Sequence, residues 1–120
     1  MHELSICQAL IEQVERLARE NEAQRVVSIV VTVGPLSGVE PDLLEHAYPL
    51  AAHGTVAEQA RLVVERTPVR VRCRKCEGET EVEMNRLICG QCGEWQVNVI
   101  EGEELLLRRV EIDTAREAVH

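Results

Sequence analysis

Aromatic residues are nearly absent from this sequence of 120 residues. They make up 2% of the chain, with one tryptophan, one tyrosine and no phenylalanine, whereas hydrophobic residues make up 45%. The core is therefore expected to be aliphatic, and side chains that stack on nucleic-acid bases are scarce. Acidic residues outnumber basic ones, 21 to 13, and the resulting formal net charge of −8 opposes binding by neutralisation of phosphates. Both features argue against a nucleic-acid partner.

Sequence patterns that define several large protein classes are also missing. No run of about 18 apolar residues occurs, so we expect no membrane span and no membrane partner. The first residues lack the basic start and apolar run of a signal peptide, and thiols in such a protein favour a cytoplasmic location. A nucleophile elbow, a phosphate-binding loop and a paired His/Glu metalloprotease motif are absent, so we do not expect an enzyme.

Two Cys-x-x-Cys motifs are the most informative feature of the chain, one at Cys73 and Cys76 and one at Cys89 and Cys92. Each motif places two sulfur atoms on one tight loop, and residues 77–88 suffice for a hairpin that folds one loop over the other. Four thiolates fill the tetrahedral coordination sphere of Zn(II), so the spacing predicts a structural zinc site without an open position. Iron in the same site, or a pair of redox disulfides, is the alternative.

The N-terminal segment has the pattern of an amphipathic helix. Apolar residues at steps of three and four predict a helix over 4–20, with Cys7 as a small buried hydrophobe on its apolar face. Ser5 and Gln8 have the spacing of a capping box. We therefore expect residues 1–3 to form a mobile arm ahead of the helix.

The remaining pattern predicts an α+β fold, with two helices packed on a small three-stranded sheet and an inserted zinc-ribbon-like module. Its expected elements are a strand over 25–33, a second helix from Pro41 that breaks or kinks at Pro49, a strand over 60–66, short strands over 80–83 and 95–100, and a strand over 104–112 with a bulge at Arg108 and Arg109. Residues 1–68 and 103–113 would form the main domain, 69–102 the zinc module and 114–120 a flexible tail.

His2 is the histidine whose neighbours suggest metal chemistry. Its imidazole lies next to the α-amino group of Met1, and together with backbone amides these nitrogens can form a planar ligand set that suits Ni(II) or Cu(II). Many proteins carry a histidine near the start, so an ordinary surface residue is the alternative.

Several short motifs occur in a fixed order along residues 1–113. They are Met1-His2-Glu3-Leu4-Ser5, Arg25-Val26, Gly34-Pro35-Leu36-Ser37-Gly38-Val39-Glu40, His53-Gly54-Thr55-Val56-Ala57-Glu58, the two cysteine pairs and Ile112. In this order the motifs resemble the HypA/HybF family of nickel metallochaperones, which serve the maturation of nickel–iron hydrogenase.

The resemblance implies both metals and partners. It implies Ni(II) as transient cargo at Met1, His2 and Glu3 in the main domain, and structural Zn(II) at the four paired cysteines. The implied partners are the GTPase HypB and the hydrogenase large-subunit precursor, and for some members urease maturation proteins. The chain departs from the family pattern at Pro49, where members usually continue the second helix, and by lacking histidine between the cysteine pairs.

A zinc-ribbon adaptor is the alternative function that the residues themselves allow. It would bind nucleic acid or an acidic protein through the basic residues near the first cysteine pair, which are Arg70, Arg72, Arg74 and Lys75.

Overall fold

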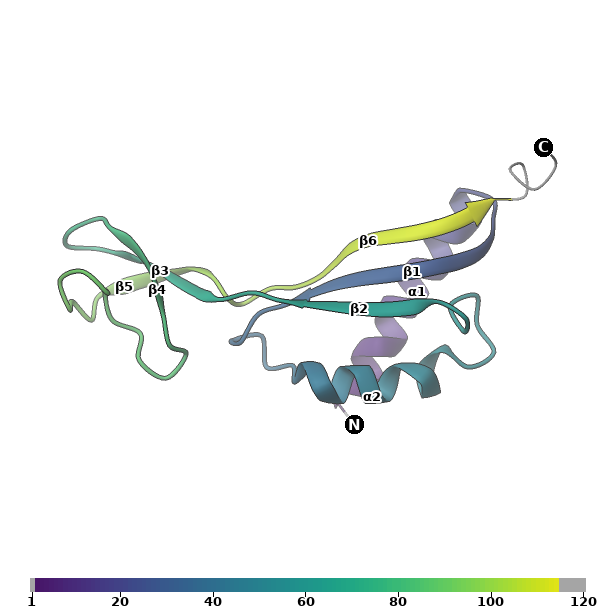
Figure 1. The fold of residues 1–120 in the computed structure, drawn as a ribbon, viewed down its shortest axis with the longest axis horizontal. Coiled ribbons are helices and arrows are strands. Elements are labelled where there is room, and N and C mark those ends of the chain that lie inside the picture. The colour runs from purple at the N-terminus through teal and green to yellow at the C-terminus, as the bar shows by residue number, and fades with distance from the viewer. Residues whose placement is uncertain (1, 115–120) are drawn as a thin grey trace. The chain divides into compact units, whose positions relative to one another are not determined.

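The computed structural model describes residues 2–114 and contains two helices and six strands (Figure 1). The elements are α1 (His2–Glu20), β1 (Ala23–Val33), α2 (Pro41–Ala52), β2 (Arg61–Arg66), β3 (Val69–Cys73), β4 (Glu79–Val82), β5 (Val97–Glu101) and β6 (Leu105–Thr114). The strands form two three-stranded sheets, ordered β2-β1-β6 and β4-β3-β5. The predicted α+β fold is confirmed, including the return of the last strand to the first sheet.

The chain divides into two compact units. The first contains α1, α2 and most of the β2-β1-β6 sheet. The second comprises Thr32–Val39 and Arg66–Leu106, and it contains the β4-β3-β5 sheet and all four paired cysteines. We expected a main domain over residues 1–68 and 103–113 and a zinc module over 69–102. These domain boundaries stay a prediction.

Aliphatic side chains fill the core of the first unit. The two helices pack against each other, and the thiol of Cys7 donates a hydrogen bond to the backbone carbonyl of Leu44 at 3.4 Å. The hydroxyl of Tyr48, on α2, donates to the carbonyl of Ala57 at 2.9 Å, which satisfies the polar group of a buried ring. Other buried residues of this unit are Ile11, Val14, Ala18, Val26, Ile29, Val30, Val31 and Ala52.

The start of α1 differs from the prediction. The helix begins at His2, so His2 and Glu3 belong to its first turn and the capping box at Ser5 and Gln8 is wrong. An acidic residue in the first turn stabilises a helix through the macrodipole. Glu3 has a second stabilising contact, because its carboxylate accepts a hydrogen bond from the backbone N–H of Glu40. Met1, the other residue of the predicted arm, lies outside the described residues.

The second helix also differs from the prediction, because α2 passes through Pro49 and ends at Ala52. A proline in a helix removes one amide donor and crowds the carbonyl four residues earlier. Here Pro49 is exposed, while its neighbours Tyr48 and Ala52 are buried. Burial of this face outweighs the local cost of the proline, so the expected break is absent.

The second unit contains a strand that we did not predict. In β3, Val69, Val71 and Cys73 are buried and alternate with two arginines. Val71 at its centre pairs with Thr80 of β4 and with Val99 of β5, both antiparallel. The sequence does alternate valine and arginine here. We assigned these residues to the start of the cysteine module and therefore expected no strand.

The burial pattern of β6 agrees with the irregularity predicted in this strand. Leu105 and Leu107 are half-buried, Arg108 and Arg109 are both exposed, and the alternation resumes at Val110. The strand ends at Thr114, which we had assigned to a tail over 114–120; residues 115–120 lie outside the described residues. Among the described residues, no helix is long and apolar enough to span a membrane.

Candidate metal-binding sites

The structure brings the four paired cysteines together. Cys73 ends β3, and the sulfur atoms of all four lie within 4.8 Å of one another. The Sγ atoms of Cys73 and Cys92 are 3.6 Å apart, as are those of Cys76 and Cys89. A tetrahedral site with Zn–S bonds of about 2.3 Å has sulfur–sulfur separations of about 3.8 Å. The cluster therefore fits a four-thiolate metal site, and none of its cysteines forms a disulfide.

Backbone amides converge on the first sulfur of each pair. The N–H groups of Lys75 and Cys76 donate to Sγ of Cys73 at 3.3 Å. The N–H groups of Gln91 and Cys92 donate in the same way to Sγ of Cys89 at 3.4 Å. Such donors stabilise a thiolate more than a thiol, so the backbone prepares these sulfurs to bind a cation.

The two cysteine turns close in the same manner. The N–H of Glu77 donates to the carbonyl of Cys73 at 3.1 Å, and the N–H of Gly93 donates to that of Cys89 at 2.9 Å. Both residues are left-handed, with φ of 62° at Glu77 and 77° at Gly93. Glycine adopts this conformation without strain, whereas the first turn holds a glutamate in it.

The pKa values of the cysteine thiols differ because their surroundings differ. The amides of Cys92 and Gln91 lower the pKa of Cys89 to about 6. The pKa of Cys92 is raised to about 12, because hydrogen bonds to the neighbouring thiols, first that of Cys73, outweigh the lowering by the Glu94 amide. Burial raises the pKa of Cys7 to about 11 and keeps this thiol neutral. Among the five cysteines, only those of the cluster share a common centre, and only Cys73 and Cys89 have a lowered pKa.

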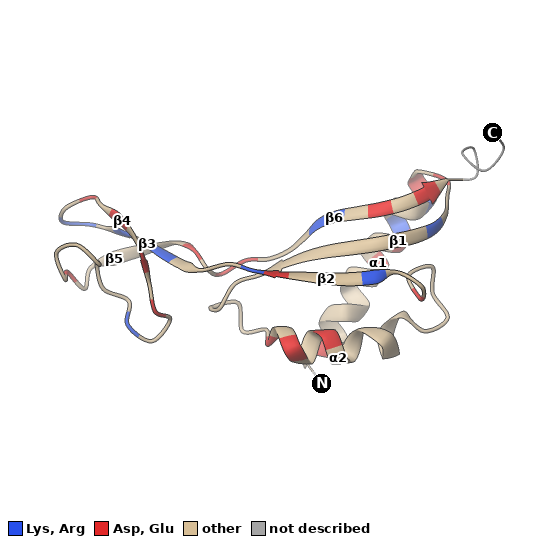
Figure 2. Ribbon diagram, in the orientation of Figure 1, with Lys and Arg blue, Asp and Glu red and all other residues tan. Residues whose placement is uncertain are grey.

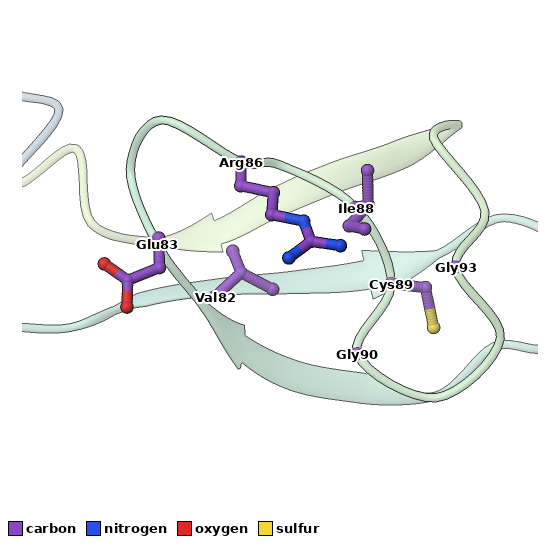
Figure 3. A pocket seen from close by; sticks show the side chains of 7 residues that line it. All are labelled: Val82, Glu83, Arg86, Ile88, Cys89, Gly90 and Gly93. Carbon is purple, nitrogen blue, oxygen red and sulfur yellow. The ribbon is translucent and has the colours of Figure 1, made fainter.

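A hollow of ≈ 380 Å³ lies beside the second cysteine turn. Figure 3 shows the side chain of Arg86 extending between Val82 and Ile88, while Glu83 points away from it. A guanidinium here places positive charge near the turn that carries Cys89.

The basic residues through which a zinc-ribbon adaptor would bind its partner are partly neutralised by an acidic neighbour. Arg70 and Arg72 both lie beside the carboxylate of Glu79, with N···O distances of 3.5 and 4.0 Å. Figure 2 shows this mixture of basic and acidic residues along β3 and β4. A polyanion would have to compete with Glu79 for both arginines, so the arrangement weakens the zinc-ribbon adaptor hypothesis.

The second candidate site lies at the start of α1. The side chain of His2 is 63% exposed, and its Nδ1 lies 3.6 Å from Oε2 of Glu3. The side chain of Glu3 is only 16% exposed, and its carboxylate accepts from the N–H of Glu40 at 3.3 Å. This amide, followed by the N–H of Glu3 itself, lowers the pKa of the Glu3 carboxyl. His2 is thus open to solvent, whereas the Glu3 carboxylate is engaged.

The sequence predicts that the four cysteines come together. It does not predict that the backbone N–H of Glu40 binds the Glu3 carboxylate. Among the described residues, the four cysteines are the only group of three or more His, Cys, Asp or Glu side chains with ligand atoms this close together. The hydrogen bond between Glu3 and Glu40 joins residues 37 positions apart. No local signal in the sequence predicts it.

Comparison with known proteins places this arrangement in context. A family model described as "Hydrogenase/urease nickel incorporation, metallochaperone, hypA" matches residues 1–112. A relative from Nitrosospira multiformis, named hydrogenase maturation factor HypA, is 51% identical over 114 residues, covering 95% of this chain and 99% of the relative. One of the same name from Aquifex aeolicus is 42% identical over 113 residues, covering 94% and 98%.

Solved structures share the fold. The solution structure of a HypA protein has a TM-score of 0.71 and 25% sequence identity, covering 93% of this chain and 96% of that one. The solution structure of the Ni metallochaperone HypA from Helicobacter pylori has a TM-score of 0.67 and 24% identity, covering 93% and 97%.

Proposed function

Because this chain belongs to the HypA family of nickel metallochaperones for hydrogenase maturation, we propose that it binds Ni(II) at its amino terminus and delivers it to the hydrogenase large-subunit precursor. A metallochaperone carries an ion and is not an enzyme. The observation that carries the proposal is the position of His2, exposed in the first turn of α1 and next to Met1.

The chemistry of a helix start supports a nitrogen site for nickel. The first four N–H groups of a helix have no partner within it, so the amides of His2 and Glu3 are not required by the helix ladder. We propose that nickel binds the imidazole of His2, these two amide nitrogens and the α-amine of Met1. A planar set of nitrogen ligands suits Ni(II). Glu3 contributes through its backbone, since its carboxylate is held by Glu40.

Binding of this kind releases protons and depends on pH. The imidazole must be neutral to bind a metal, so protons compete with nickel for its nitrogen. Nickel affinity should therefore fall as the solution becomes more acidic. An exposed site is also suited to release, because a partner can reach the ion directly.

The four paired cysteines would hold Zn(II), as the sulfur geometry and the amide donors support. Zinc with four protein ligands has no open position, so its contribution is structural. It would fold the β4-β3-β5 sheet and its two cysteine turns into one unit. A colourless preparation with one zinc per chain would agree with this, whereas a red protein would indicate iron.

The partners that we propose are those implied by the family. We propose that the GTPase HypB acts with this chain in the cytoplasm and that the precursor of the hydrogenase large subunit receives the nickel. Urease maturation proteins are further proposed partners, because the description of the family includes urease.

The experiment that tests the nickel site compares two histidines of the first unit. His2→Ala should abolish tight nickel binding in a calorimetric titration of the zinc-loaded protein. His46→Ala is the matched control, because His46 is also exposed and its Nδ1 contacts the carbonyl of Asp42 at 2.8 Å. If His2→Ala binds nickel as the wild type does, the proposed site is wrong.

A further inference from the structure

An apolar groove lies between the first turn of α1 and the outer side of α2. It has a volume of ≈ 350 Å³ and is lined by Glu3, Leu4, Leu43, His46, Ala47 and Leu50. All of these residues belong to the first compact unit.

Two leucines make this groove unusual for a surface. Leu43 is 53% exposed and Leu50 is 67% exposed. They are seven residues apart on α2, so they lie two turns apart on the same side of the helix, separated by about 10 Å. Ala47 and Leu4 fill the space beside them. Two exposed leucines over a hollow of this size are a typical feature of a groove that receives apolar side chains from a helix.

The chain segments that form the groove carry charged side chains of one sign, apart from histidines. Residues 2–15 and 26–60, which contain the groove and its surroundings in the sequence, include no lysine or arginine. Acidic residues are frequent there, with Glu3 in the wall and Asp42 and Glu45 on α2. Figure 2 shows acidic and no basic residues on α2. A partner surface with lysine or arginine beside its apolar residues would be attracted, and an acidic one repelled.

We propose that this groove binds a helical segment of a partner protein that carries two apolar side chains about two turns apart, flanked by lysine or arginine. The inference rests on the proposed function, because Glu3 forms one wall of the groove and also belongs to the proposed nickel site. A partner bound here lies directly beside the cargo. The groove is thus the surface that selects the protein with which nickel is exchanged.

The test uses the full-length, zinc-loaded and nickel-free protein. The double variant Leu43→Gln with Leu50→Gln removes the apolar groove without touching the core. Leu106→Gln is the matched control, because Leu106 is 56% exposed but lies on β6. Binding of purified HypB and of purified hydrogenase large-subunit precursor is measured by calorimetry at low and high salt. Equal melting temperatures show that all variants are folded.

We expect the double variant to weaken binding of at least one of these proteins by about tenfold or more, since buried central residues dominate interface affinity. Leu106→Gln should bind as the wild type does. Wild-type binding should also weaken with added salt, as charge complementarity requires. The proposal is overturned if neither protein depends on Leu43 and Leu50, or if neither binds.

A second copy of this chain is a competing occupant. Sedimentation would reveal it as a wild-type dimer that the double variant converts to a monomer, and this result would also overturn the proposal. Failure of the nickel proposal is recognised separately, because the groove variants should bind nickel as the wild type does, whereas His2→Ala tests nickel binding without altering Leu43 or Leu50.

Discussion

The carboxylate of Glu3 accepts a hydrogen bond from the backbone N–H of Glu40 at 3.3 Å. Glu40 is the N-cap of α2, and its own side chain accepts from the N–H of Asp42. One contact therefore joins the first turn of α1 to the cap of the second helix. The side chain of His2 stays exposed to solvent beside this contact. The contact also explains how His2 and Glu3, which we expected in a mobile arm, belong to the helix.

Replacing Glu3 should separate the role of its carboxylate from that of its backbone. Glu3→Gln keeps an acceptor for the Glu40 N–H, whereas Glu3→Ala removes the contact. Hydrogen exchange of the Glu40 amide should therefore be faster by roughly severalfold in Glu3→Ala and nearly unchanged in Glu3→Gln. Equal exchange in wild type and Glu3→Ala would show that the contact is not formed in solution.

Loss of one cluster cysteine should remove zinc and unfold the second unit. Cys89→Ser replaces one of the four proposed zinc ligands, and structural zinc contributes on the order of 10 kcal/mol to folding. Native mass spectrometry should then detect no zinc, and the amide resonances of β3, β4 and β5 should collapse. Cys7→Ser is the control, because Cys7 is buried in the other unit. Retention of zinc by Cys89→Ser would contradict the site.

Replacing Pro49 should stabilise the protein. Pro49→Ala restores an amide donor in α2 at an exposed position, where no packing is lost. The gain in the folded state is partly offset, because alanine makes the unfolded chain more flexible. We expect a net increase of about 1 kcal/mol in the free energy of unfolding, measured with urea. A decrease would show that proline fits this helix better than alanine.

Features that depend on residues close together in the sequence were predictable, and features that depend on distant residues were not. The four cysteines were predictable because each pair is local and the metal geometry restricts the spacing. The choice of His2 as a nickel ligand also came from its neighbours in the chain, and it stays a prediction. The start of α1 was not predictable, because Glu40 lies 37 positions from Glu3. The path of α2 through Pro49 depends on burial of the opposite face, which no local rule contains.

A carboxylate in the second unit should make its stability depend on pH. Glu104 accepts from the N–H of Gly102 at 2.8 Å and from the hydroxyl of Thr67 at 3.1 Å. Its own N–H, followed by that of Gly102 and the Thr67 hydroxyl, lowers the pKa of Glu104 below its ordinary value of 4.5. A lowered folded-state pKa stabilises the fold above pH 4.5, and this contribution is lost as the pH falls through the folded value.

Glu104→Gln is the variant that isolates this effect. Its side chain stays neutral, so the variant should be less stable than the wild type by about 1 kcal/mol at pH 7. The difference in urea midpoint should stay constant to about pH 5 and then narrow in more acidic solution. Loss of zinc in acid affects both proteins alike, so their difference is the readout. A difference that grows in acid would contradict the assignment.

We propose above all that nickel binds at the free α-amine of Met1 and at His2. The most direct measurement is a calorimetric nickel titration at neutral pH of the zinc-loaded protein with a free α-amine, beside the same protein acetylated at that amine. Acetylation removes one nitrogen ligand and leaves every side chain intact. The account predicts one tightly bound nickel per chain with the free amine and an affinity at least about tenfold lower after acetylation. Equal affinities would contradict it and move the nickel site away from Met1 and His2.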